Sequence, residues 1–296
     1  MLRGLKSHPL AAYFVLAYAI SWLSLGPLAL DSQGLLPFHI PSGFFSSILA
    51  LVGSSGPLLS ALLLTATIQG ASGMHAFFRQ FLVWRVGLRW YLIVLFEPAL
   101  VTLITILFAS LLGGASFDFA HPPVTHQLAL PPGANPWVLF VPVFLLGGLV
   151  GGPVGEEPGW RGYALAKLQD RYSALVASLI LGVLWSVWHL PFFFIKGTSE
   201  STTPFLLFAL GVIAWSILIT WVYNHTRGSV LLALLFHNAL NITALYLPLS
   251  RLNDWQGVVA QCLVALVVVI ATDPARFSRR SLPARPPSVS EPLSSR

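Results

Sequence analysis

The chain has 296 residues, of which 56% are hydrophobic and only 9% are charged. A soluble domain carries about 25% charged residues, so a soluble fold of this composition would lack the polar side chains that cover a surface. Lipid as the solvent removes that difficulty, because a helix satisfies its backbone hydrogen bonds internally. The net charge of +6 does not indicate nucleic acid, since the sixteen Lys and Arg form no basic stripe. We interpret these residues as loop signals that set membrane topology.

The predicted elements are apolar segments of a length suited to crossing a bilayer, which takes about 20 residues. They lie near 11–30, 43–68, 90–112, 138–167, 174–195, 204–223, 229–247 and 255–272. These segments predict an all-α fold, a polytopic membrane bundle of about eight transmembrane helices within one domain, 1–273. The first segment is followed by no small-x-small cleavage site, so we expect an uncleaved helix. The tail 274–296 is rich in Pro, Ser and Arg and is expected to be disordered in the cytoplasm.

The distribution of basic residues predicts which loops lie in the cytoplasm. If eight spans alternate from a cytoplasmic N-terminus, the outer side receives only Lys196 and Arg251. The cytoplasmic side receives the other Lys and Arg, namely Arg3, Lys6, Arg79, Arg85, Arg89, Arg161, Lys167, Arg171, Arg227, Arg276, Arg279, Arg280, Arg285 and Arg296. Cytoplasmic loops of membrane proteins are enriched in Lys and Arg. The pattern predicts that both termini are cytoplasmic, and we expect an integral protein of a bacterial plasma membrane.

Ionisable residues inside the predicted spans are candidates for function, because they are costly there and usually face a partner or a water-filled cavity. The third segment contains Glu97, directly before Pro98. Glu97 matches no motif, and we favour a structural role for it over a place in a shared cavity.

The fourth segment contains an acidic pair, Glu156 and Glu157, followed by Arg161. Successive helix positions point about 100° apart, so the two carboxylates face different directions. Glu157 and Arg161 are four residues apart and share a face. We hypothesise that Arg161 neutralises Glu157 while Glu156 faces a cavity. The alternative is that all three side chains form one structural ion-pair cluster.

Two later spans each carry a polar pair at helical spacing. Trp185 and His189 share one face of the fifth span, and His237 and Asn241 share one face of the seventh. At 1.5 Å per residue, His237 and Asn241 lie about 12 and 18 Å from the cytoplasmic start of their helix. Glu156 lies at a matching depth of about 18 Å if its helix continues past Arg161. The groups are therefore expected to converge in the inner half of the bilayer.

A carboxylate, two imidazoles and a carboxamide in a dry cavity are suited to hydrolysis. Glu156 can take a proton from water, helped by His189. His237 and Asn241 can donate hydrogen bonds to the oxyanion of a tetrahedral intermediate. The set Glu156, His189 and His237 can instead hold zinc, since two His and one Glu form a known catalytic zinc site. No H-E-x-x-H motif is present, so spacing leaves both possibilities open and assigns no certain cofactor.

Three motifs in this order resemble one known family. They are E-E-x-x-x-R (Glu156, Glu157, Arg161), an aromatic-x-x-x-H (Trp185, His189) and H-x-x-x-N (His237, Asn241). Together they resemble the CPBP family, which comprises type II CAAX prenyl endopeptidases and the bacteriocin-processing or self-immunity proteins also called Abi proteins. The resemblance covers about 136–247. Two features depart from the common pattern: Trp185 stands where Phe is usual, and Pro158 follows the acidic pair.

The resemblance implies an intramembrane endopeptidase, glutamate-dependent or a metalloprotease. It implies that Glu156 is the general base, that His189 helps to hold water, and that His237 and Asn241 form the oxyanion site. Arg161 would support Glu157. The substrate would be a membrane-associated peptide or protein, and whether it must be prenylated or otherwise lipidated is open, as are its cleavage site and the oligomeric state.

Two other functions remain as alternatives. The first is a non-catalytic self-immunity or scaffold protein, whose phenotype would survive loss of Glu156 and His189. The second is a proton-coupled transporter, since buried Glu and His also relay protons. Many transporters are built from two related halves, and no internal repeat is visible here. The enzyme is therefore preferred.

Overall fold

The computed structural model describes residues 7–113, 117–128, 130–131, 133–149, 152–249 and 254–272. Within these ranges the chain is helical and contains no strand, so the predicted all-α class is confirmed. The predicted tail 274–296 and Arg251 lie outside the described residues.

The N-terminal half consists of long helices. They are α2 (Pro9–Ser32), α3 (Phe44–Ser54), α4 (Gly56–Arg79) with the short turn η1 (Gln80–Leu82), and α5 (Leu88–Gly113). The C-terminal half begins with α6 (Pro123–Gln127), η2 (Pro136–Leu139), α7 (Phe140–Leu149), α8 (Gly152–Gly159), η3 (Trp160–Leu165) and α9 (Ala166–Leu168). It continues with α10 (Ala174–Trp188), η4 (Leu190–Phe194), η5 (Glu200–Thr202), α11 (Phe205–His225), α12 (Val230–Tyr246) and α13 (Trp255–Ala271).

Six helical segments in the described part of the chain are long and apolar enough to cross a membrane. They are Pro9–Ser32, Gly56–Leu82, Leu88–Gly113, Pro136–Leu168, Ala174–Phe194 and Phe205–His225. The helices α12 and α13 are apolar but have 17 residues each. At 1.5 Å per residue they are about 26 Å long, less than the roughly 30 Å of a hydrocarbon core. The chain is thus an integral membrane protein, and the expected count of eight spans stays a prediction.

The second predicted span, 43–68, is wrong as a single helix. The chain breaks between α3 and α4, and the segment suited to crossing the membrane is Gly56–Leu82. Pro57 lies in the first turn of α4, a position that proline favours because its missing N–H has no partner there anyway. Gly155 of α8 packs directly against this break, where a Cβ would lie 2.6 Å from the Ser54 carbonyl oxygen.

The fourth predicted span is helical past Arg161, as the depth argument required. The path from Gly152 to Leu168 runs without a break through α8, η3 and α9. Pro158 lies inside α8, and the turn that follows it, Trp160–Leu165, is a π-helix. Prolines and π-turns are each a recognised cause of helix kinks, so this stretch departs from regular α-helix geometry.

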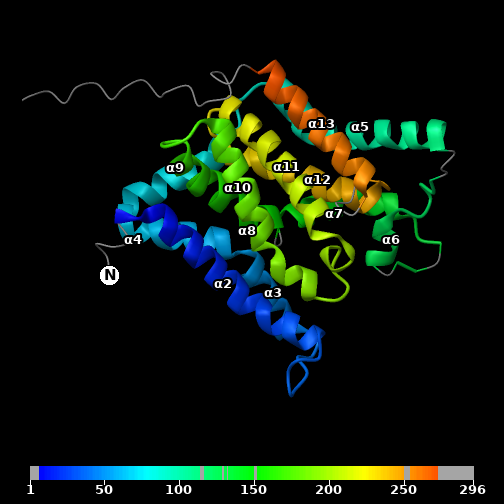
Figure 1. The fold of residues 1–296 in the computed structure, drawn as a ribbon, viewed down its shortest axis with the longest axis horizontal. Coiled ribbons are helices and arrows are strands. Elements are labelled where there is room, and N and C mark those ends of the chain that lie inside the picture. The colour runs from blue at the N-terminus through cyan, green and yellow to red at the C-terminus, as the bar shows by residue number, and fades with distance from the viewer. Residues whose placement is uncertain are drawn as a thin grey trace, which may run out of the picture.

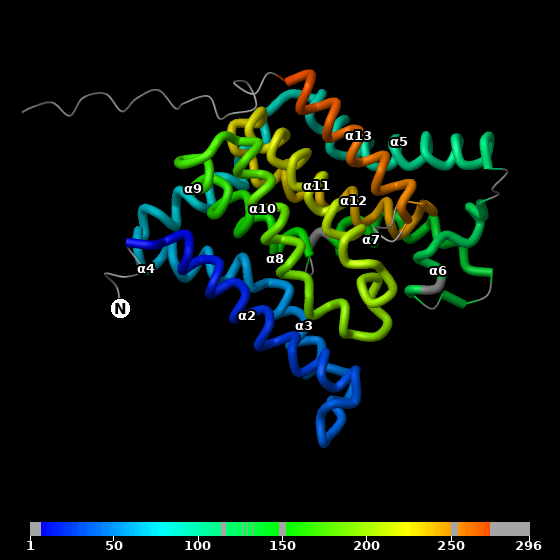
Figure 2. Tube along the Cα trace, viewed as in Figure 1, coloured from blue at the N-terminus to red at the C-terminus, as the bar shows by residue number. Residues whose placement is uncertain are grey.

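The helix α8 lies at the centre of the bundle (Figure 1), where it packs against α4 on one side and α12 on the other. Around this centre α2 packs on α4, α10 on α11, and α11 on α13. The path of the chain in Figure 2 shows α2, α10 and α11 running side by side across the molecule. The largest fully buried side chains include Trp160, Arg161, Trp185 and Trp188, whereas many large apolar side chains on the outer helices are exposed, as a lipid-facing surface requires.

Candidate active site

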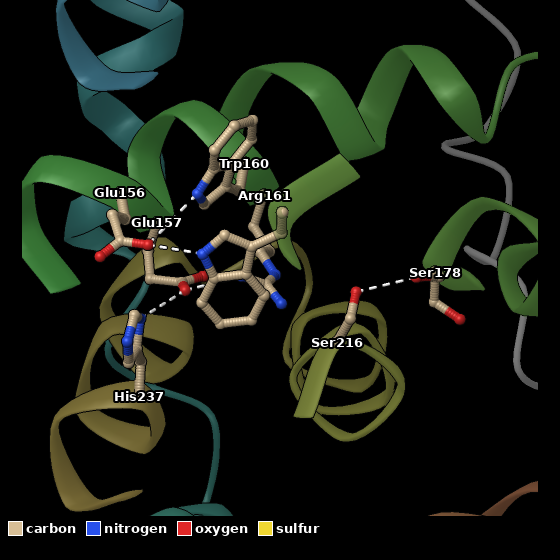
Figure 3. Close-up of polar contacts among 8 residues, drawn as sticks. Glu156, Glu157, Trp160, Arg161, Ser178, Ser216 and His237 are labelled. Carbon is tan, nitrogen blue, oxygen red and sulfur yellow. Dashed lines mark hydrogen bonds and ion pairs between the residues drawn. The ribbon is translucent and has the colours of Figure 1, made fainter. Parts of the chain in front are cut away.

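The acidic pair of α8 is buried, with 4% of Glu156 and none of Glu157 exposed. Arg161 Nη1 donates to Glu157 Oε1 at 2.6 Å, so the pair predicted from the helical spacing is present. The same oxygen accepts from His237 Nδ1 at 2.8 Å (Figure 3), which ties α12 to α8. The Arg161 guanidinium also lies 4.5 Å from the centre of the Trp185 ring. Glu157 Oε1 is therefore the shared acceptor of Arg161 and His237, a wider role than sequence spacing indicated.

Glu156 takes no part in that ion pair and accepts hydrogen bonds from two indoles instead. Its Oε2 accepts from Trp185 Nε1 at 2.6 Å and from Trp160 Nε1 at 3.4 Å. Figure 3 shows a dashed contact from Glu156 to Trp160, whereas the contacts of Glu157 run to Arg161 and His237. The two carboxylates thus have separate partners, and the alternative of a single cluster with Arg161 is wrong.

The two imidazoles are each fixed through Nδ1. His189 caps the C-terminal end of α10, and its Nδ1 lies 2.8 Å from the Trp185 carbonyl oxygen. A carbonyl can only accept, so Nδ1 of His189 carries the hydrogen and the neutral ring has its lone pair at Nε2. The carboxylate of Glu157 likewise only accepts, so Nδ1 of His237 is also a donor. Both rings have Nε2 left for other partners.

All four residues predicted to be catalytic line one cavity of about 500 Å³. Glu156, His189, His237 and Asn241 reach it from α8, α10 and α12. A Cβ built on Gly152 would lie 3.7 Å from Asn241 Nδ2, which places this amide beside the start of α8. The rest of the wall combines a few aliphatic residues with aromatic and polar ones, among them Trp188, Trp215, Phe192, Phe208, Gln127, Ser199, Glu200 and Thr203. No Lys or Arg is among the described residues of the wall.

The possible zinc set does not fit this geometry. In the part of the chain that the structure describes, no three His, Cys, Asp or Glu side chains are grouped closely enough to hold a metal ion. Glu156 Oε2 already accepts from two indoles. We therefore derive no step through a metal.

Glu97 lies in α5 and is not part of the cavity wall. Neither of its carboxylate oxygens has a hydrogen-bond partner among the described residues, although both are buried. This agrees with the expectation that Glu97 does not share the site.

Sequence reasoning missed several residues of the site. Trp160 is four residues after Glu156, so helical spacing contained the signal for its contact. Trp188 donates through Nε1 to Ser21 Oγ at 2.7 Å and lies edge-on to His189 at 4.7 Å. The spacing around His189 gave no sign of this partner in α2. Glu200 belongs to the connection before α11, where no periodic pattern marks it.

Fold and site together define a polytopic helical membrane protein with a buried carboxylate, imidazole and amide cavity. Residues 136–243 match the family described as Type II CAAX prenyl endopeptidase Rce1-like. A similar protein is CAAX prenyl protease 2 of Methanococcus maripaludis, which is 37% identical over 118 residues, or 38% of this chain and 43% of the relative. The similarity to type II CAAX prenyl endopeptidases thus lies between 136 and 243, and the chain spans less than half the length of this relative.

Proposed function

We propose that the protein is an intramembrane endopeptidase that hydrolyses a peptide bond of a membrane-associated substrate. The observation that carries the proposal is the single cavity that Glu156, His189, His237 and Asn241 line. The match of residues 136–243 to a CAAX endopeptidase family supports the reaction type. A cavity of about 500 Å³ has room for the side chains around one peptide bond together with a water molecule.

Glu156 acts as the general base in this proposal. Its Oε2 is held by the two indoles, so Oε1 takes the proton of a water molecule while the water oxygen attacks the peptide carbonyl carbon. Glu156 then delivers that proton to the amide nitrogen as the C–N bond breaks. His189 has its Nε2 lone pair available, so it accepts a hydrogen bond from the O–H that the water keeps and orients the attack.

His237 and Asn241 stabilise the negative oxygen of the tetrahedral intermediate. The Asn241 amide nitrogen is a donor in any state. His237 already donates through Nδ1 to Glu157, so a second donation through Nε2 requires the doubly protonated ring. The Glu157 carboxylate that His237 contacts balances that charge, and Arg161 holds the same carboxylate in place. Glu157, Arg161 and Trp185 are positioning residues.

The test is cleavage of an internally quenched peptide that carries a farnesylated cysteine, delivered in micelles to the purified protein. A positioned general base contributes about 10²–10⁴-fold, so Glu156→Gln should lose cleavage to that extent. The matched control is Glu97→Gln, which makes the same change at a buried carboxylate outside the cavity. Full cleavage by Glu156→Gln would refute the mechanism. The same peptide without the farnesyl group tests whether the lipid is required.

A further inference from the structure

The first long helix, α2, lies outside the part of the chain that matches the endopeptidase family, yet its side chains are bonded to the end of α10. The Tyr18 hydroxyl donates to the Leu184 carbonyl, and Trp22 Nε1 donates to the Trp188 carbonyl at 3.0 Å. In return, Trp188 Nε1 donates to Ser21 Oγ at 2.7 Å. These α2 residues are three and four positions apart, so one face of α2 holds the last turn of α10.

The bonds from α2 meet backbone groups that the end of α10 leaves open. The last four carbonyls of a helix have no partner within that helix. The carbonyl of Trp188, the last residue of α10, is taken by Trp22. The Trp185 carbonyl, in the same turn, is taken by His189 Nδ1 at 2.8 Å. A side chain of α2 and an imidazole of the candidate active site therefore cap the same helix end.

The C-terminal end of α2 also holds the segment that follows His189. Gln33, the C-cap residue of α2, donates through Nε2 to the Phe194 carbonyl at 2.8 Å. Ser32 Oγ accepts from the Lys196 backbone N–H at 2.7 Å. Between these bonds and the end of α10, η4 packs directly on α2. The chain is thus fixed by α2 both before and after His189, at the junction of α10 and η4.

The indole of Trp188 connects these bonds to the site. It is fully buried and forms a T-shaped contact with the His189 ring, with the ring centres 4.7 Å apart and the planes at 85°. It also makes a T-shaped contact at 5.9 Å with Trp160, which donates to Glu156. A rotation of the Trp188 ring would therefore change the packing of the proposed partner of the water and of a donor to the proposed base.

The hydroxyl of Ser21 sets the orientation of the Trp188 indole. The indole N–H is the one polar group of that side chain, and it can only donate. Ser21 is itself fully buried, and a Cβ on Gly56 of α4 would lie 2.1 Å from Ser21 Oγ, so the hydroxyl is held between α4 and α10. Without the hydroxyl the buried indole N–H would lose its partner, which costs free energy and removes the bond that orients the ring.

We propose that Ser21 and Trp22 are positioning residues for His189, which makes α2 a part of the active centre. They act through Trp188, since Ser21 holds its indole and Trp22 holds its carbonyl. The effect on catalysis rests on the proposed function, whereas the effect on the orientation of the His189 ring does not. In catalysis, the Nε2 lone pair of His189 meets the water only while the ring keeps its angle.

The first test compares Ser21→Ala with Ser216→Ala in the quenched-peptide assay. Ser216 is also fully buried, and its Oγ donates to the Ser178 carbonyl of α10 at 2.9 Å (Figure 3). Its loss removes a similar interhelical bond at a part of α10 remote from His189. Ser21→Ala should lower kcat about 3- to 10-fold, as loss of one neutral hydrogen bond allows, while Ser216→Ala stays within about twofold of the wild type. Equal losses in the two variants overturn the inference.

The second test shows whether the effect passes through His189. Trp22→Phe keeps a ring but loses the donor to the Trp188 carbonyl, so it should lower kcat by a factor similar to that of Ser21→Ala. In a His189→Gln background each of these substitutions should cost less than about twofold, because the side chain that they position is gone. A merely structural role would cost the same factor in both backgrounds, so losses that multiply overturn the inference.

The nitrogen NMR spectrum of the histidine rings separates this inference from the proposed function. The signals of His189 are identified by their loss in His189→Gln. Ser21→Ala should shift them, and Ser216→Ala should leave them in place. Unchanged His189 signals in Ser21→Ala overturn the inference, whether or not the protein cleaves the peptide. Shifted signals together with no cleavage by the folded wild type refute the enzyme and leave the positioning of His189 by α2 intact.

Discussion

Replacing Arg161 by Met should destabilise the protein severely. The substitution tests whether the buried Glu157 carboxylate depends on its ion pair with Arg161. Both side chains are fully buried, and their atoms are 2.6 Å apart. Removing one partner of a buried ion pair costs about 3–5 kcal/mol, because the remaining charge stays buried without its counterpart. His237 still contacts Glu157 at 2.8 Å, so the loss should fall toward the lower part of that range.

The assay is the free energy of unfolding of the purified protein in mixed micelles, with SDS as the denaturant. Lys167→Met is the matched control, since Lys167 lies in the same helical segment and its cation lies over the Tyr163 ring, 4.3 Å from the ring centre. The double variant Glu157→Gln with Arg161→Met should lose less free energy of unfolding than the two single variants lose together, because neither charge is then buried without its partner. A stability of Arg161→Met equal to that of Lys167→Met, or strict additivity of the pair, would refute the reasoning.

Three further substitutions test the cavity itself. Trp185→Phe keeps an aromatic ring beside Arg161 but removes the hydrogen bond from Trp185 Nε1 to the Glu156 carboxylate. A hydrogen bond to a charged group contributes about 1.5–3 kcal/mol, so cleavage should slow at least tenfold. The control Trp215→Phe, in the same cavity wall, should cleave normally. Asn241→Ala should lower kcat by about 10²–10³-fold with little change in KM, as loss of one oxyanion donor does; an equal loss in Asn238→Ala, whose amide binds the Phe144 carbonyl instead, would contradict the assignment. Glu200→Lys should raise KM for basic peptides and lower it for acidic ones relative to Asp118→Lys. Unchanged KM ratios would show that the charge of Glu200 in the cavity wall does not affect which peptides bind.

The local part of the site could be predicted from the sequence, because helical spacing decides it. The i,i+4 relation paired Glu157 with Arg161, and the turn between neighbouring residues separated Glu156 from Glu157. Hydropathy placed α2, α5 and α11 within a few residues of the predicted segments 11–30, 90–112 and 204–223.

The remaining features depend on contacts between distant parts of the chain. The bond from His237 to Glu157 joins residues 80 positions apart, and the Trp188–Ser21 bond joins residues 167 apart. No periodicity predicts such partners. The Gly56–Pro57 pair is a local sequence signal for the break at Ser55. The packing of Gly155 from α8 against that break depends on the tertiary structure and has no such signal.

The central claim is that the Glu156 carboxylate activates water inside this cavity. The most direct measurement compares cleavage of the farnesylated quenched peptide by the wild type, Glu156→Gln and Glu97→Gln at equal amounts of folded protein in detergent. The account predicts that Glu156→Gln loses about 10²–10⁴-fold in kcat, while Glu97→Gln cleaves like the wild type. Cleavage by Glu156→Gln at the wild-type rate, or an equal loss in both variants, would contradict it.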